Sequence, residues 1–209
     1  KGKKSSVAGL LTETAAAFHA KGLAVSINVP ADDPAFPYKA ISDVVDQVIV
    51  MAYDEHWAAG KPGPIASLPW FTKVLRARAA QIPSSKLVVA LGSYAYDWPK
   101  GKPAEEATFE EAVLTAKESE GRIAIDPASL NPHFDYQDEN DVNHDVWLMD
   151  ATTVYNGMIA AMPLQPAGFA LWRLGGEDPS IWTFFGADWT FGTQTVKRLE
   201  EIRFDYDLD

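Results

Sequence analysis

The stretch at residues 48–57 reads VIVMAYDEHW, an uncharged apolar run that ends abruptly in polar and aromatic side chains. Such a run is typical of a parallel strand that is covered on both faces. Because side chains at i and i+2 of a strand share a face, Met51 and Tyr53 should point the same way, with Asp54 just beyond the strand. Functional groups of parallel α/β folds gather at the carboxyl ends of strands, which makes this segment the first candidate for a site. A buried strand that merely leads into a polar loop explains the segment equally well.

Composition limits the classes of protein to consider. The 209 residues are 47% hydrophobic and include seven Trp, enough to bury a sizeable core as one domain. The net charge of −11 argues against nucleic acid and against anionic membrane surfaces as partners. Cysteine is absent, which excludes disulfides and thiolate metal sites. No stretch approaches the roughly 20 apolar residues of a membrane span. The chain starts without Met or a signal-peptide pattern, and we expect it to be a piece of a longer protein.

Hydrophobic periodicity and capping residues predict alternating strands and helices. The first helix is expected to start at Ser5 or Ser6 and to stop at Gly22, and Ser67 and Asp150 are expected to cap two later helices. Helices are expected over residues 8–20, 38–45, 69–80 and 152–162, and strands over residues 23–29, 47–53, 86–92 and 168–172. This alternation predicts a parallel sheet.

The segment between the third and fourth strands is too long for a plain crossover. It contains the capping box Thr108…Glu111 and a predicted hairpin of residues 134–136 against 144–148. A small α+β insertion over the carboxyl end of the sheet is the expected structure. Four strands could form a small doubly wound sheet, but GxGxxG and GxxxxGK[ST] are both absent, which disfavours a nucleotide site. The other option is part of an eight-stranded barrel, which needs about 250 residues.

Three motifs resemble glycoside hydrolase family 18 barrels. Residues 51–54, MAYD, resemble the signature on the sixth barrel strand, and residues 168–172, GFALW, resemble the eighth strand. Residues 87–98 resemble the seventh strand and the aromatic loop beyond it, and residues 97–148 lie where many members insert an α+β subdomain. MAYDEHW, GPIAS and ALWRLGGEDPSIW resemble bacterial members that are fused to a polysaccharide deacetylase and a processive glycosyltransferase.

The resemblance implies the C-terminal half of a (β/α)8 TIM barrel, strands 5–8, with the insertion between the last two strands. The expected division is β/α units over 1–96, the insertion over 97–148, the last helix and strand over 149–185, and a tail over 186–209. The family's Asp-x-x-Asp-x-Asp-x-Glu motif, which carries the general acid, is absent from this sequence. The fragment is therefore expected to be inactive alone.

Family 18 enzymes use the 2-acetamido group of the substrate as the nucleophile, an exception to the two-carboxylate scheme. By resemblance, Tyr53 would donate to the acetamido oxygen, Asp54 would bond the sugar or the acid, and Trp172 would form the apolar floor. Substrate contacts are also expected at the following positions: Met51, Tyr96, Trp98, Asn28, Glu55 and Trp57. Each has a plainer alternative: Met51 could be core filler, Tyr53 and Asn28 satisfied interior groups, Tyr96 and Trp98 anchors of the insertion, and Glu55 and Trp57 solvated loop residues.

Metal and cofactor sites are not predicted. Asp135, Asp138, Glu139 and Asp141 suggest a calcium loop, but the Gly and terminal Glu of an EF-hand are missing, and a hairpin turn explains them better. No GxSxG nucleophile elbow occurs.

The expected partner is an oligo- or polysaccharide of β-linked N-acetylglucosamine, such as a chitin-like exopolysaccharide or peptidoglycan glycan, hydrolysed with retention by the complete barrel. A non-catalytic lectin-like domain, or a structural domain beside a glycosyltransferase, is the alternative. Open barrel edges favour self-association of the fragment. The remaining expectations are other domains in the parent chain and an extracytoplasmic or membrane-anchored location through them.

Overall fold

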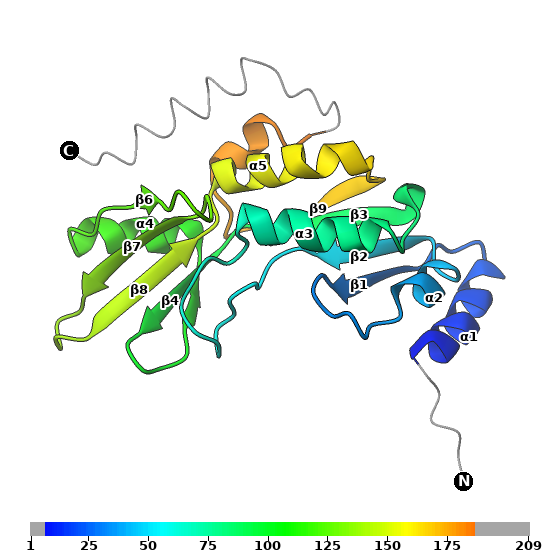
Figure 1. Ribbon diagram of the computed structural model, residues 1–209, viewed down its shortest axis with the longest axis horizontal. Helices are drawn as coiled ribbons and strands as arrows, with labels where there is room; N and C mark the ends of the chain where they lie inside the picture. The colour runs from blue at the N-terminus through cyan, green and yellow to red at the C-terminus, as the bar shows by residue number, and fades with distance from the viewer. Residues whose placement is uncertain (1–6, 187–209) are drawn as a thin grey trace, which may run out of the picture.

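The computed structural model describes residues 7–186 and contains two sheets that lie side by side (Figure 1). The first sheet is parallel, with strand order β1-β2-β3-β9, and the second is antiparallel, with order β5-β4-β8-β7-β6. The strands are β1 Ser26–Pro30, β2 Gln47–Met51, β3 Leu87–Gly92, β4 Ala95–Pro99, β5 Glu105–Ala107, β6 Ala124–Ile125, β7 Pro132–Gln137, β8 Asn143–Leu148 and β9 Gly168–Trp172. The α-helices are α1 Val7–His19, α2 Tyr38–Ser42, α3 Leu68–Ala79, α4 Phe109–Glu118 and α5 Ala151–Ala161. Short 3₁₀ turns are Ser84–Lys86, Met162–Leu164 and Pro179–Thr183.

Helices α3 and α5 cover one face of the parallel sheet (Figure 1). Alternate strand residues such as Val48, Val50 and Leu91 are fully or almost fully buried against these helices. The intervening residues point to the opposite face, where Asn28 is exposed and Met51 is half-buried. This second face is open at β1 and β2, where Asn28 and Met51 lie, and closed at β3, where Val88 and Ala90 are buried.

The local capping signals of the sequence are confirmed. Ser67 accepts a hydrogen bond from the backbone amide of Trp70 at the start of α3, and Asp150 accepts one from Thr153 at the start of α5. The Thr108…Glu111 capping box is present at the start of α4. Each of these side chains satisfies an amide that the helix leaves without a partner.

Three predicted elements differ from the structure. The strand predicted over 47–53 ends at Met51, so Tyr53 lies just beyond it. The first strand begins at Ser26 rather than at residue 23, because Val25 is bonded to Asp46: its amide donates to the carboxylate at 2.7 Å and its carbonyl accepts from the Asp46 amide at 2.9 Å. The helix predicted over 38–45 ends at Ser42. The expected tail at 186–209 and the start of the first helix at Ser5 or Ser6 fall outside the described residues, apart from Gly186.

The antiparallel sheet forms the excursion between β3 and β9. It begins at Ala95, earlier than the expected start of the insertion at 97, because β4 already pairs there with Leu148 of β8. The predicted hairpin is confirmed as β7 and β8, with His133 opposite Trp147 and Gln137 opposite Asn143. Helix α4 packs on one face of this sheet through Ala112 and Ala116.

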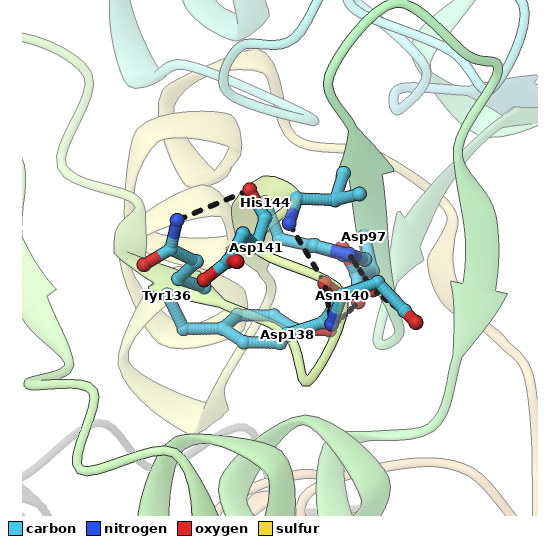
Figure 2. Close-up of polar contacts among 8 residues, drawn as sticks. Asp97, Tyr136, Asp138, Asn140, Asp141 and His144 are labelled. Carbon is cyan, nitrogen blue, oxygen red and sulfur yellow. Dashed lines mark hydrogen bonds and ion pairs between the residues drawn. The ribbon is translucent and has the colours of Figure 1, made fainter.

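The acidic tip of that hairpin is a turn closed by its own side chain. The Asp138 carboxylate accepts hydrogen bonds from the amides of Asn140 and Val142 at 2.9 and 2.8 Å, which confirms the hairpin-turn interpretation. Figure 2 shows the neighbouring contacts: His144 is bonded to Asp97 at 2.6 Å, and the Tyr136 hydroxyl donates to the same carboxylate at 2.6 Å. These bonds tie the hairpin to β4.

Candidate functional site

Asp54 follows β2 and is held by two tyrosine hydroxyls, one from Tyr94 between β3 and β4 and one from Tyr96 of β4. The Tyr94 hydroxyl donates to Oδ1 of Asp54 at 2.5 Å, and the Tyr96 hydroxyl donates to the same oxygen at 3.1 Å. Oδ2 has no partner within residues 7–186 and remains available as an acceptor. Asp54 has φ of 64°, a left-handed conformation that Asp tolerates better than most residues. The turn therefore directs the carboxylate to the sheet edge at a modest backbone cost.

The rings around Asp54 form a continuous edge-to-face ladder. Ring centroids lie 6.0 Å apart for Tyr53 and Tyr94, 5.3 Å for Tyr94 and Tyr96, and 5.2 Å for Tyr96 and Trp98. Such pairs hold aromatic side chains in defined orientations. The ladder joins the end of the parallel sheet to β4 of the insertion and makes one rigid wall of both.

Burial and the negative charge of Asp54 keep these phenols protonated. Burial, and secondarily the Asp54 charge, raises the pKa of Tyr53 to about 12. The pKa values of Tyr94 and Tyr96 are raised by the same two causes, with the hydrogen bond to Asp54 adding to both. The Tyr53 hydroxyl has no hydrogen-bond partner in the described part of the chain, so this protonated group is free to donate.

Trp172 lies at the same edge, two strands away from β2. It pairs with Gly92 in the ladder between β3 and β9, and its carbonyl accepts from the Ser93 amide at 2.7 Å. Its side chain is 48% exposed. Gly92 allows the close approach of its neighbours, because a Cβ there would lie 2.8 Å from the Tyr94 ring and 3.3 Å from Cβ of Tyr53. Tyr53, Asp54 and Trp172 are thus brought to one edge of the sheet.

Four other predicted site residues, on β1, at the end of β2 and in the loop after it, differ in exposure and in hydrogen bonding. Trp57 is exposed in the loop after Asp54, while the Glu55 carboxylate accepts from the Ser67 amide at 2.7 Å at the start of α3. Met51 is half-buried at the end of β2, and Asn28 is exposed on the neighbouring strand β1.

Trp98 is where the structure contradicts the expected substrate contact. Its side chain is 1% exposed and packs in a cluster with Ile65, Tyr94 and Met149. A ring enclosed in this way has no face to offer to a sugar, so Trp98 anchors the insertion, as the plainer alternative supposed. Tyr96 is also buried, at 7% exposed, but its hydroxyl reaches Asp54.

Tyr94 and Arg173 were not among the predicted site residues. Tyr94 lies in the aromatic segment SYAYDW, but nothing in its spacing showed that its hydroxyl reaches Asp54. Arg173 follows Trp172 and forms an ion pair with Glu106 of β5 at 3.3 Å, opposite Tyr96 in the sheet. A positive charge directly after the Trp that ends the strand was the sequence signal that could have found it.

Residues 7–186 contain neither a metal-binding arrangement of side chains nor a membrane-spanning helix. No group of three or more His, Asp or Glu side chains there is arranged to hold a metal ion. The helices in this range are also too short or too polar to cross a membrane.

Comparison with known proteins identifies the family. The model for glycosyl hydrolases family 18 matches residues 1–176. This match covers most of the chain, which therefore belongs to family 18, and the resemblance read from MAYD and GFALW is confirmed.

Relatives with this family's fold include spore proteins and chitinases. The cortical fragment-lytic enzyme of Bacillus anthracis is 30% identical over 73% of this chain and 37% of its own length. The crystal structure of the Bacillus cereus spore cortex-lytic enzyme SleL has a TM-score of 0.76 at 26% identity, over 84% of this chain and 44% of that chain. A chitinase from Chromobacterium violaceum has the same fold, with a TM-score of 0.76 at 24% identity, over 84% of this chain and 58% of that one. The chain thus spans less than half the length of these two Bacillus relatives.

Proposed function

We propose that this chain forms strands 5–8 of a family 18 (β/α)8 barrel and contributes the acetamide-binding side of a glycan site. The strand order β1-β2-β3-β9, all parallel, and the sheet face left partly exposed at β1 and β2 support this assignment. The insertion between β3 and β9 fits it as well, and its elements begin and end near the boundaries 97 and 148. In the complete barrel the missing strands would cover the face that carries Asn28 and Met51.

The proposed ligand is a β-linked N-acetylglucosamine polymer, either chitin-like or peptidoglycan glycan. The observation that carries this proposal is the triad of an unpaired Tyr53 hydroxyl, a carboxylate fixed by Tyr94 and Tyr96, and an exposed Trp172 at one sheet edge. Tyr53 would donate to the acetamido oxygen, Oδ2 of Asp54 would accept from the acetamido N–H or from the acid, and Trp172 would pack under the pyranose ring.

In the complete barrel these groups would support retaining hydrolysis. The acetamido carbonyl oxygen attacks the anomeric carbon while an upstream Glu protonates the leaving oxygen, and water later opens the oxazolinium ion. Fixed donors around the acetamide orient the nucleophile and stabilise the positive charge that develops on it. Without that Glu, the proton transfer worth about 10²- to 10⁴-fold is lost, so the 209 residues alone would bind rather than cleave.

A lectin-like role is the second candidate, in which the complete barrel would keep the glycan site and lack the acid. The complete protein should be assayed with N-acetylglucosamine oligomers and with peptidoglycan fragments, for binding and for release of reducing ends. Binding with cleavage supports the hydrolase, binding without cleavage supports the lectin, and binding of neither rejects the glycan site.

A further inference from the structure

The loop between β2 and α3 is pinned at both ends. The Glu55 amide donates to the Ile65 carbonyl at 2.8 Å, and the Glu55 carboxylate accepts from the Ser67 amide at 2.7 Å. Ile65 and Ala66 are buried in the same cluster as Tyr94 and Trp98. The far end of the loop is thus part of the cluster that contains Tyr94, and Glu55 ties the near end to it.

His56 closes the loop from inside. Its Nδ1 lies 2.9 Å from the carbonyl oxygen of Pro64. Because a carbonyl oxygen only accepts, this contact is a hydrogen bond when Nδ1 carries the proton. Gly63 lies directly beneath the ring: a Cβ at that position would be 2.6 Å from Nδ1 and 2.7 Å from Cε1. The closed form of the loop therefore requires both a ring N–H donor at His56 and a residue without a side chain at Gly63.

Between these contacts the loop displays Trp57. Its side chain is 57% exposed, and its carbonyl accepts from the Gly60 amide at 2.7 Å. A Cβ on Gly60 would lie 3.4 Å from Cδ1 and Nε1 of the indole, so the ring rests along the loop backbone. The Ala58 carbonyl also accepts from the Ala104 amide of the insertion at 2.7 Å. The loop backbone is thus fixed on both sides of Trp57, and its ring lies along that backbone with more than half of the residue in solvent.

A single exposed Trp needs no explanation by itself. The hydrogen bonds around Trp57 do call for an explanation, because they order a loop that buries little apolar surface. Trp57 and Lys61 remain exposed, although Gly63 is buried. Ordering a loop in advance lowers the entropy cost of binding to the groups that it presents. An exposed aromatic face that is fixed next to Asp54 suits a second pyranose ring of the same glycan.

We propose that His56 and Gly63 are positioning residues that lock the loop so that Trp57 forms a second sugar platform beside the Asp54 site. This inference rests on the proposed function. It assigns roles to two residues that would not touch the glycan themselves and act through Trp57.

The test is a double-mutant cycle in the complete protein, with affinity for tetra-N-acetylchitotetraose measured by calorimetry. His56→Ala should weaken binding about tenfold, the order expected when a pre-ordered ring becomes mobile. Trp57→Ala should weaken it at least as much, and the double variant no more than Trp57→Ala, since His56 acts only through that ring. His56→Asn should restore most of the affinity, because its amide can donate to Pro64 from the Nδ1 position.

Glycine variants supply the matched control. Gly63→Ala should weaken binding as His56→Ala does, whereas Gly186→Ala, where an added Cβ meets nothing within 4 Å, should bind like wild type. Unaltered binding by His56→Ala, or losses that multiply in the double variant, would overturn the positioning role while leaving the glycan site intact. A wild-type protein that binds no oligomer would reject the proposed function and this inference together.

Discussion

The Tyr94→Phe variant tests the arrangement around Asp54 by removing a single hydroxyl group. Tyr94→Phe deletes the 2.5 Å hydrogen bond to Oδ1 and retains the ring, whose edge-to-face contacts with Tyr53 and Tyr96 should persist. Hydrogen bonds to charged groups contribute about 1.5–3 kcal/mol. Asp54 is exposed to water and keeps the 3.1 Å bond from Tyr96, so the lower end applies: about 1.5 kcal/mol, or roughly tenfold in affinity.

The assay is calorimetric titration of the complete protein with an N-acetylglucosamine tetramer, accompanied by urea unfolding. Tyr136→Phe is the matched control, because its hydroxyl donates to a different carboxylate, that of Asp97, at 2.6 Å near the hairpin tip (Figure 2). Both variants should lose about 1.5 kcal/mol of folding free energy, and only Tyr94→Phe should also lose affinity. Equal affinities of Tyr94→Phe and wild type, or equal losses in both variants, would refute the reasoning.

Three further predictions address the fold and the site. Asp178→Ala should lower the free energy of unfolding in urea by about 2–3 kcal/mol, because this buried carboxylate accepts from the amides of Ala151 and Ser180. A loss below about 1 kcal/mol would contradict a stabilising role for these two hydrogen bonds. Trp172→Ala should change the unfolding free energy little, since the ring is 48% exposed, but should lower tetramer affinity about tenfold or more by calorimetry; the reverse pattern would make Trp172 a core residue. The pKa of Tyr53 is raised from 10.0 to about 12, so its protonation stabilises the fold fully below pH 10, and this contribution is lost as pH rises from 10 towards 12. Tyrosinate absorbance of wild type minus Tyr53→Phe should therefore titrate near pH 12, and a midpoint near pH 10 would contradict a buried phenol.

Local signals predicted the elements well. The uncharged run before Asp54 is β2, the alternation of strands and helices is a parallel sheet, and the capping side chains at Ser67, Thr108 and Asp150 mark helix starts. These features depend on neighbours a few residues away, which is why one sequence reveals them.

The contacts that build the site depend on residues distant in the chain. Tyr96 and Trp98 share a strand face, yet nothing in their alternation shows that the loop residues Ile65 and Ala66 bury Trp98 while the Tyr96 hydroxyl reaches Asp54. The role of Tyr94 likewise required the spatial position of the turn after β2. The strand start at Ser26 depends on the bond between Val25 and Asp46, which periodicity cannot show.

The most direct measurement of the central claim is a crystal structure of the complete protein with tetra-N-acetylchitotetraose bound. We expect one acetamido oxygen within hydrogen-bond distance of the Tyr53 hydroxyl, the same group near Oδ2 of Asp54, and a pyranose ring packed on Trp172. A ligand bound elsewhere, or a sugar at this edge with its acetamide turned away from Tyr53 and Asp54, would contradict the account.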